Sequence, residues 1–230
     1  MKSKYEYCLF DLDGTLTDPA PGITASVAYA LKKFGITVSN LSELNKFIGP
    51  PLVYSFKTYY NFTDEMANRA LSYYRERFSA GGLYENEIYP GIAELLESIK
   101  SCGGKIILAT SKPEEFAVKI LEHFDILKHF EFVAGNTLDE TRPEKRQVIE
   151  HILSKYPDIS SKNAVMIGDR EYDILAAKEF SIPSVGVLFG YGSFEELNAA
   201  APDEIAVSVT KLSELLIDEE FEMPDFGSVN

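Results

Sequence analysis

The sequence of 230 residues contains no tryptophan, only two cysteines and no long apolar segment. Cys8 and Cys102 cannot build the disulfide framework of a small secreted domain, and two free thiols suit a reducing compartment. No apolar run approaches the roughly 18 residues that a membrane-spanning helix needs. No signal-peptide core follows the first residues, because Asp11 and Asp13 interrupt it. We therefore expect a cytoplasmic protein that does not associate with membranes.

Positive charge is also scarce. The chain has 22 Lys and Arg residues against 36 Asp and Glu residues, which gives a net charge of −14. A surplus of this sign repels nucleic acids and anionic lipids, so neither is an expected partner. Hydrophobic residues make up 45% of the chain, which is a globular rather than a disordered composition. The length fits one domain with an insertion, or two small domains.

Five short apolar runs predict the strands of a sheet. They lie at residues 5–10, 105–109, 130–134, 164–167 and 184–188. Helical patterns occur between them, at residues 91–101, 113–124, 143–153 and 172–180. Strands that alternate with helices are typical of a parallel α/β sheet with helices on both faces.

Residues 19–89 contain no run that resembles a strand. Helical patterns lie instead at residues 23–34, 52–60 and 64–78. Glycine and proline punctuate the region, most densely at Gly49-Pro50-Pro51. We therefore predict a helical insertion, the cap, at residues 19–89, within a core domain that contains the sheet and is made of residues 1–18 and 90–215.

Charge and aromatic residues divide along the same boundary. Residues 19–89 carry a net charge of +1, which leaves −15 for the rest of the chain, and they hold 13 of the 28 aromatic residues. Either a small helical bundle uses these large side chains for its own core, or the cap offers an aromatic, less repulsive face to an anionic substrate. Residues 216–230 contain no base and are predicted to be a solvated acidic tail.

Two aspartates follow the first predicted strand directly, in Asp11-Leu12-Asp13-Gly14-Thr15. The carboxyl ends of parallel strands form the binding crevice of such a sheet. One carboxylate there can attack phosphorus or bind a metal, while the other handles the proton of a leaving group. Gly14 allows the chain to turn out of the strand without a clash of a Cβ atom.

Polar groups also follow the second and fourth predicted strands. Thr110 and Ser111 lie just before a helix, where hydroxyls either bind an oxyanion or cap the helix. Asp169 and Asp173 flank the next turn from strand to helix, and their oxygen ligands suit a hard cation such as Mg²⁺.

A lysine after the third strand could neutralise both a carboxylate and a phosphoryl oxygen. Lys145 is the candidate, because it lies at the start of a helix after Thr-Arg-Pro. Lys155 and Lys162 also precede the fourth strand and are the alternatives.

Together these groups resemble the four motifs of the haloacid dehalogenase-like hydrolase superfamily. FDLDGTLTD (Phe10–Asp18) is similar to the first motif, LATSKP (Leu108–Pro113) to the second, Lys145 to the third, and VMIGDREYD (Val165–Asp173) to the fourth. The resemblance implies a three-layer, Rossmann-like sheet in the order 3-2-1-4-5, with a helical cap inserted after the first strand.

The resemblance also implies catalytic and metal-binding roles. Asp11 would attack phosphorus and form an aspartyl-phosphate, and Asp13 would protonate the leaving alcohol and then activate water. Mg²⁺ would be bound by the Asp11 carboxylate, the backbone carbonyl of Asp13, and Asp169. Asp173 would bind it directly or through water.

Phosphate-binding roles follow from the same resemblance. Thr110, the backbone amide of Ser111, and Lys145 would hold the phosphoryl oxygens. The presence of Asp13 disfavours a dehalogenase, which needs no proton for an alkoxide.

Three segments are similar to the phosphoglycolate phosphatase-like branch, some relatives of which are 5′-nucleotidases. They are FDLDGTLTDPAPGI, FIGPPL (Phe47–Leu52) and VLFGYGSFEEL (Val187–Leu197). We therefore expect a small phosphomonoester as the substrate, phosphoglycolate-like or a nucleoside monophosphate, and a monomer or homodimer. Gly49 in the cap loop and Lys112 beside the hydroxyl pair are candidate substrate contacts.

Substrate choice stays open. The cap loop FIGPPL contains no arginine for the carboxylate of phosphoglycolate. Other cap cations could serve instead, namely Lys46, Lys57, Arg75 and Arg77. Cap aromatic rings could stack on a nucleotide base. The alternatives in function are a sugar-phosphate mutase of the same fold and a phosphate-sensing protein without turnover.

Overall fold

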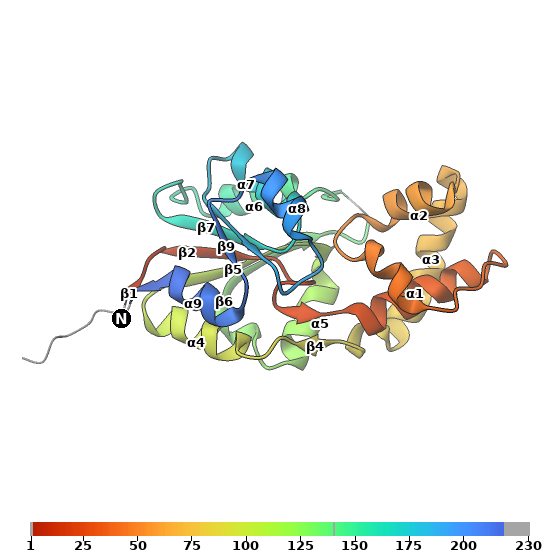
Figure 1. Cartoon of the computed structure of the whole chain (residues 1–230), viewed down its shortest axis with the longest axis horizontal. Coiled ribbons are helices and arrows are strands. Elements are labelled where there is room, and N and C mark those ends of the chain that lie inside the picture. Colours follow the sequence, from red (N-terminus) through yellow and green to blue (C-terminus); the bar gives the residue numbers. More distant parts are fainter. Residues whose placement is uncertain (1, 140, 219–230) are drawn as a thin grey trace, which may run out of the picture.

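The computed structural model describes residues 2–139 and 141–218 (Figure 1). A six-stranded parallel sheet forms its centre, in the order β6-β5-β2-β7-β8-β9. The strands are β2 (Tyr7–Phe10), β5 (Lys105–Pro113), β6 (Phe130–Asn136), β7 (Ala164–Gly168), β8 (Ser184–Val187) and β9 (Glu204–Ala206). Counted along the chain, the order is 3-2-1-4-5-6, so the predicted α/β fold and strand order are confirmed. The sequence did not predict β9, because its three residues form no apolar run.

Helices cover both faces of this sheet (Figure 1). One face carries α4 (Ile92–Ser101), α5 (Glu114–His123) and α9 (Val209–Leu216), and the other carries α6 (Lys145–Lys155) and α7 (Glu171–Glu179) with α8 (Phe194–Ala200) packed on α7. Strand β2 shows why its sequence is a continuous apolar run. Cys8 and Phe10 belong to the hydrophobic cluster of the first face, and Tyr7 and Leu9 to that of the second. Successive side chains of a strand point to opposite faces, so all four are buried.

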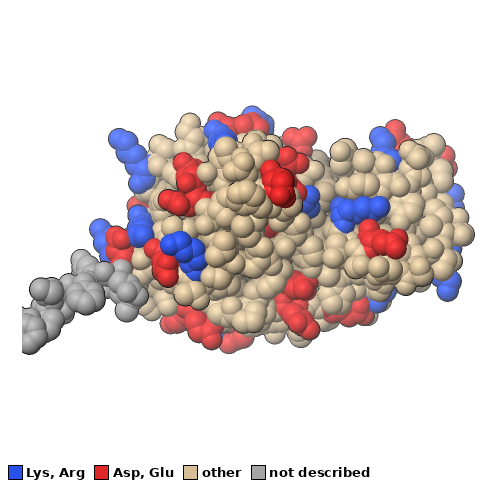
Figure 2. All heavy atoms as spheres, in the orientation of Figure 1, with Lys and Arg blue, Asp and Glu red and all other residues tan. Residues whose placement is uncertain are grey.

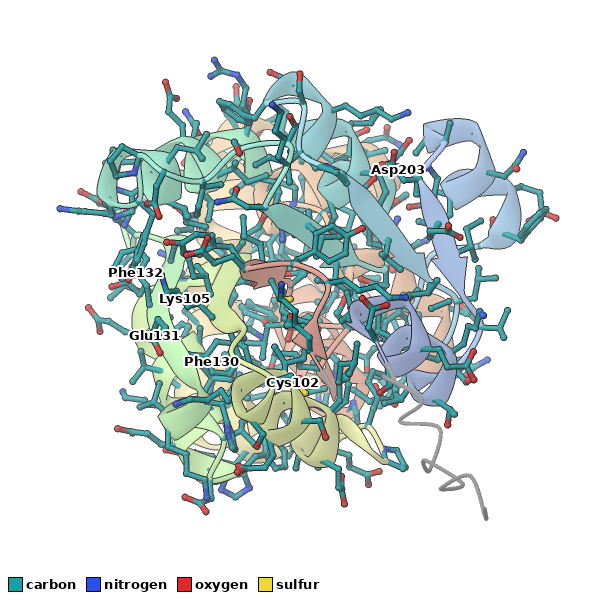
Figure 3. The ribbon with its side chains drawn as sticks, turned by 90° about the vertical axis from the view of Figure 1, so that its left-hand side faces the viewer. Cys102, Lys105, Phe130, Glu131, Phe132 and Asp203 are labelled. Carbon is teal, nitrogen blue, oxygen red and sulfur yellow. The ribbon has the colours of Figure 1, made fainter. Side chains whose placement is uncertain are left out.

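The predicted helical insertion lies beyond one end of the sheet (Figure 1). It consists of α1 (Ala20–Lys32), α2 (Leu52–Tyr60) and α3 (Asp64–Ala80), with 3₁₀ segments at Leu41–Phe47 and Gly82–Tyr84. Outside the insertion, a further 3₁₀ segment, Leu127–His129, precedes β6. Figure 3 views the opposite end, where Lys105 and Phe130 begin β5 and β6. The cap therefore faces the carboxyl ends of the strands.

Two short strands join the cap to the core. β3 (Thr17–Asp18) and β4 (Glu87–Ile88) pair antiparallel where the chain enters and leaves the insertion. The prediction that residues 19–89 contain no strand is therefore wrong for β4. A strand of two residues is too short to show the alternation that predicts strands.

Aromatic side chains form the interior of the cap. The Phe56 ring lies 5.1 Å from that of Phe47 and 5.9 Å from that of Phe62, which in turn lies 4.7 Å from that of Phe34. This packing favours the first explanation of the aromatic bias, a core of the cap's own. Side chains of both signs lie on the cap in Figure 2.

The two ends of the described chain meet beside the core. β1 (Lys2–Ser3) pairs antiparallel with β10 (Ile217–Asp218), and Leu216 is the buried last residue of α9. The prediction that a solvated tail starts at residue 216 is therefore wrong, because Leu216 and Ile217 pack into the core. Residues 219–230 lie outside the described residues. In the part of the chain that the structure describes, no helix combines the length and apolarity needed to cross a membrane.

We predict that Phe56→Ala lowers the free energy of unfolding by about 3–5 kcal/mol, because it removes a fully buried ring from the centre of the cap. Tyr54→Ala, on the exposed side of the same helix, is the control and should change it by about 0.5 kcal/mol or less. Urea denaturation measures both. Equal losses for the two variants would contradict a cap with its own core.

Candidate active site

A lysine and two aspartates meet at the carboxyl end of the sheet. Asp11 follows β2, Asp173 lies in the first turn of α7, and Lys145 begins α6. The Lys145 Nζ atom lies 2.8 Å from Asp11 Oδ1 and 2.8 Å from Asp173 Oδ1, and it donates a hydrogen bond to the carbonyl oxygen of Ala109 at 2.7 Å. All three side chains of the ion pairs are buried. The other candidate lysines, at positions 155 and 162, are exposed.

A third aspartate completes a group of acidic ligands. Asp11, Asp169 and Asp173 each offer one carboxylate oxygen, and these atoms lie within 4.8 Å of one another. Asp169 is fully buried; its Oδ2 accepts a hydrogen bond from the Tyr191 amide at 2.8 Å, whereas among the described residues nothing donates to its Oδ1. Clustered carboxylate oxygens, one of them buried without a donor, fit a hard divalent cation such as Mg²⁺.

The electrostatics of Asp169 and Asp173 point the same way. Burial raises the pKa of Asp169 well above its usual range, and the neighbouring Asp173 and Asp11 carboxylates raise it further. Burial also raises the pKa of Asp173 to about 6, although Lys145 opposes this shift. A bound divalent cation favours the charged form of its ligands and would reverse both shifts.

Backbone geometry fixes the position of Asp169. Gly14 has φ of +84°, in the left-handed region, and a Cβ atom at this position would lie 2.1 Å from Asp169 Oδ2. Glycine is therefore required here for two reasons, the turn after β2 and the approach of the carboxylate. Asp173 is held by its other oxygen, since its Oδ2 accepts a hydrogen bond from the Arg170 amide at 3.2 Å.

Asp13 lies apart from the three clustered carboxylates. Its side chain pairs with Lys112, whose Nζ lies 2.6 Å from Asp13 Oδ2 and 5.1 Å from the centre of the Phe78 ring. Burial raises the pKa of Asp13, and the Lys112 ammonium opposes the shift. Lys112 thus contacts a carboxylate of the site and an aromatic ring of the cap.

A cavity of about 90 Å³ opens between these groups and the cap. Its polar wall is formed by Asp11, Asp13, Thr110, Ser111, Lys112 and Asn136. Its apolar wall includes Ile23, Phe47, Leu52, Val53, Leu71, Tyr74, Phe78 and Phe116, with Gly49, Pro50 and Pro51 at its edge. The structure therefore brings the predicted aspartates, hydroxyl residues, lysines and Gly49 to one place.

Tyr191, Arg170 and Asn136 belong to the site and were not predicted from the sequence. Tyr191 donates its amide to Asp169, and its hydroxyl donates to Asp18 at the base of the cap. Its signal was the glycine-flanked Gly190-Tyr191-Gly192 after β8. Arg170 lies inside the fourth motif, yet nothing in the motif indicates where its side chain points.

The sequence profile of the haloacid dehalogenase-like hydrolases matches residues 8–187. The chain belongs to this family. This confirms the predicted family from a match that covers all four motifs and the cap between them. The members of this family are hydrolases, so the family match supports the prediction that the chain is a hydrolase.

Several known proteins are similar to this family member over most of its length. A 5′-nucleotidase of Pseudomonas aeruginosa is 43% identical (93% of this chain, 96% of that protein). Tyrosine-protein kinase PtkA of Mycobacterium tuberculosis is 35% identical (90% and 71%), and a phosphoglycolate phosphatase of Vibrio parahaemolyticus is 27% identical (90% and 94%). The crystal structure of a predicted phosphatase from Clostridium acetobutylicum superposes with a TM-score of 0.89 at 49% identity, over 93% of this chain and 98% of that one. Two of these relatives carry names of phosphoric monoester hydrolases, the enzyme class that the sequence predicts.

We predict that Mg²⁺ raises the melting temperature, because it relieves repulsion among the three buried carboxylates. At about 100 times its Kd, Mg²⁺ would add about 2.7 kcal/mol to the free energy of unfolding, or about 5–10 °C. Asp169→Asn removes one ligand and one repelling charge, so this variant should gain clearly less. Differential scanning calorimetry at constant ionic strength measures the shift.

Glu115→Gln is the matched control, since it removes an exposed carboxylate of α5 that does not belong to the acidic cluster. It should keep the full response to Mg²⁺. A wild-type melting temperature that does not change with Mg²⁺, or an equal gain in Asp169→Asn, would count against a cation at this site.

Proposed function

We propose that the chain is a Mg²⁺-dependent phosphatase that hydrolyses a small phosphomonoester through an aspartyl-phosphate on Asp11. The observation that carries the proposal is the position of Asp11. Its carboxylate is buried beside the Lys145 ammonium, belongs to the acidic cluster with Asp169, and lines the same cavity as Thr110. A nucleophile, charge neutralisation and an oxyanion cradle are what phosphoryl transfer requires.

In the first step, an oxygen of Asp11 forms a bond to phosphorus while the bond to the leaving oxygen breaks. Asp13 gives its proton to that oxygen, a role that suits a carboxyl group whose pKa is raised by burial. In the second step, Asp13 takes a proton from water, and the water oxygen displaces the Asp11 carboxylate from phosphorus. Inorganic phosphate is released, and both aspartates return to their starting forms.

The surrounding residues neutralise and orient the negatively charged phosphoryl group during both steps. Mg²⁺, bound by Asp11, Asp169 and Asp173 with the carbonyl of Asp13, would neutralise negative charge on the phosphoryl group. The Lys145 ammonium, 2.8 Å from Asp11 Oδ1, adds positive charge beside the nucleophile. Thr110 and the Ser111 amide orient the phosphoryl oxygens.

The cavity walls bear on the choice of substrate. Two cations line the cavity: Lys112, whose charge is shared with Asp13, and Arg75 of α3, which donates a hydrogen bond to the carbonyl oxygen of Leu138. The rest of the cap wall is mainly apolar and includes the rings of Phe47, Tyr74 and Phe78. We therefore propose that a phosphomonoester with an uncharged, apolar or aromatic leaving group is preferred to phosphoglycolate. The likeness to a 5′-nucleotidase supports nucleoside monophosphates as candidates.

The remaining expectations from the sequence are kept as proposals. Residues 19–89 form the cap and residues 1–18 and 90–215 the catalytic core. Cytoplasmic location and a monomer or homodimer remain predictions. A mutase would interconvert isomers without release of phosphate, and a phosphate sensor would bind without turnover, so a phosphate-release assay separates both from a phosphatase.

Asp11→Asn should lower the rate of phosphate release from an aryl phosphate about 10³-fold or more, because an amide cannot form the acyl phosphate. A far-ultraviolet circular dichroism spectrum that matches that of the wild type shows that the variant still folds. The assay is run with and without Mg²⁺ and with a count of phosphate released against substrate consumed. Activity within about tenfold of wild type would refute the role of Asp11.

Asp13→Asn should affect substrates according to their leaving groups. For an alkyl phosphate, kcat/KM should fall about 100-fold or more, the usual contribution of a general acid. For p-nitrophenyl phosphate the fall should be much smaller, because nitrophenolate leaves without a proton and kcat/KM reports only the steps up to its departure. Equal losses for the two substrates would show that Asp13 is not the proton donor.

A further inference from the structure

Arg170 makes contacts in two directions from the loop that carries Asp169. Its Nε atom pairs with Glu196 Oε1 at 2.8 Å, and its Nη1 atom donates a hydrogen bond to the carbonyl oxygen of Ile48 in the cap. The Arg170 side chain is only 14% exposed. A charge-assisted hydrogen bond in so sheltered a position is stronger than one at the surface. One guanidinium therefore connects the aspartate loop of the core to the cap.

The cap backbone next to Ile48 lies directly on the Arg170 side chain. Gly49 has φ of +103°, and a Cβ atom built on it would lie 2.8 Å from Arg170 Nη1 and 3.0 Å from its Cγ. Gly49 and the following Pro50 line the cavity. The segment that Arg170 holds is therefore the edge of the leaving-group wall.

The other end of the contact is anchored in the core. Glu196 Oε1, which pairs with Arg170, also accepts a hydrogen bond from the Glu171 amide at 3.0 Å. The position of Glu196 is set by Ser193, whose hydroxyl accepts a hydrogen bond from the Glu196 amide at 3.1 Å at the start of α8. Arg170 thus extends from a fixed carboxylate toward the cap.

We propose that Arg170 is a positioning residue that holds the cap loop, residues 48–51, over the leaving-group side of the cavity. The inference rests on the proposed phosphatase function, since it concerns the same cavity. A closed cap loop excludes water and orients the leaving group, whereas the phosphoryl group is held by core residues. Loss of Arg170 should then weaken binding of the whole substrate more than binding of inorganic phosphate.

Arginine is needed for this geometry. Its planar fork donates to Glu196 through Nε and to Ile48 through Nη1 at the same time. A lysine has one ammonium at the end of a flexible chain and cannot occupy both positions. Arg170→Lys is therefore expected to behave like Arg170→Met, even though it keeps the charge.

The experiment compares wild type, Arg170→Met, Arg170→Lys and Glu196→Gln. The control is Arg146→Met, which removes an arginine that pairs with Glu179 at 2.7 Å on the core surface. For each, KM and kcat are measured for an aryl phosphate, together with the inhibition constant of inorganic phosphate and the Kd of Mg²⁺. Hydrogen exchange of a peptide covering residues 41–56 reports the cap loop independently of turnover.

In both Arg170 variants, KM should rise about tenfold, the factor expected for loss of one charge-assisted hydrogen bond. Exchange in residues 41–56 should accelerate, with phosphate inhibition and the Kd of Mg²⁺ unchanged. Glu196→Gln should change KM and exchange in the same direction but less, and Arg146→Met should match the wild type.

Two results would overturn the inference. One is unchanged KM and exchange in Arg170→Met. The other is a parallel loss of substrate, phosphate and Mg²⁺ binding, because that would mean damage to the aspartate loop itself. If the wild type releases no phosphate, the proposed function fails, and the exchange comparison still decides whether Arg170 holds the loop.

Discussion

Three carboxylates buried around one ammonium are the constraint on which the rest of the site depends. Asp11, Asp169 and Asp173 would carry three negative charges against the single charge of Lys145, in a region from which water is largely excluded. Such an arrangement is costly unless further positive charge is supplied or protons are retained. The raised pKa values of Asp169 and Asp173 express that cost. A divalent cation bound by the three carboxylates would supply the missing positive charge.

The parallel sheet makes this concentration of charge possible. Adjacent strands β2 and β7 end at the same edge, so residues more than 150 positions apart along the chain become neighbours. The buried cluster is connected from there to the cap by two contacts at different points. Tyr191 links Asp169 to Asp18 of strand β3, which pairs with β4, and Arg170 reaches the cap loop. Hydrogen bonds therefore join the loops around the acidic cluster to the cap at two separate points.

The fold and the acidic cluster were predictable because both leave local signals. A strand covered on both faces is apolar at every position, as in Tyr7–Phe10, and polar residues directly after such strands must share one edge. Strands β9, β3 and β4 were not predictable, because pairing of two or three residues depends on neighbours distant in the sequence. The same holds for side-chain direction. The sequence places Arg170 beside Asp169 but cannot show that its side chain reaches Ile48. Lys112 was predicted to contact substrate, and nothing in the sequence indicates that its side chain pairs with Asp13.

The core and the cap contribute different kinds of residues to the cavity. The charged and hydroxyl groups that suit phosphoryl chemistry come from strand ends of the core, whose positions are fixed by the sheet. The apolar wall comes mainly from cap helices and the cap loop, whose positions depend on a few contacts with the core. Phe78 illustrates the connection, since its ring packs against Phe116 of the core and lies over the Lys112 ammonium. For the proposed phosphatase, a change in the cap would alter which leaving group fits and leave the chemistry of the core unchanged; two relatives that match both parts are named for different substrates, a 5′-nucleotidase and a phosphoglycolate phosphatase.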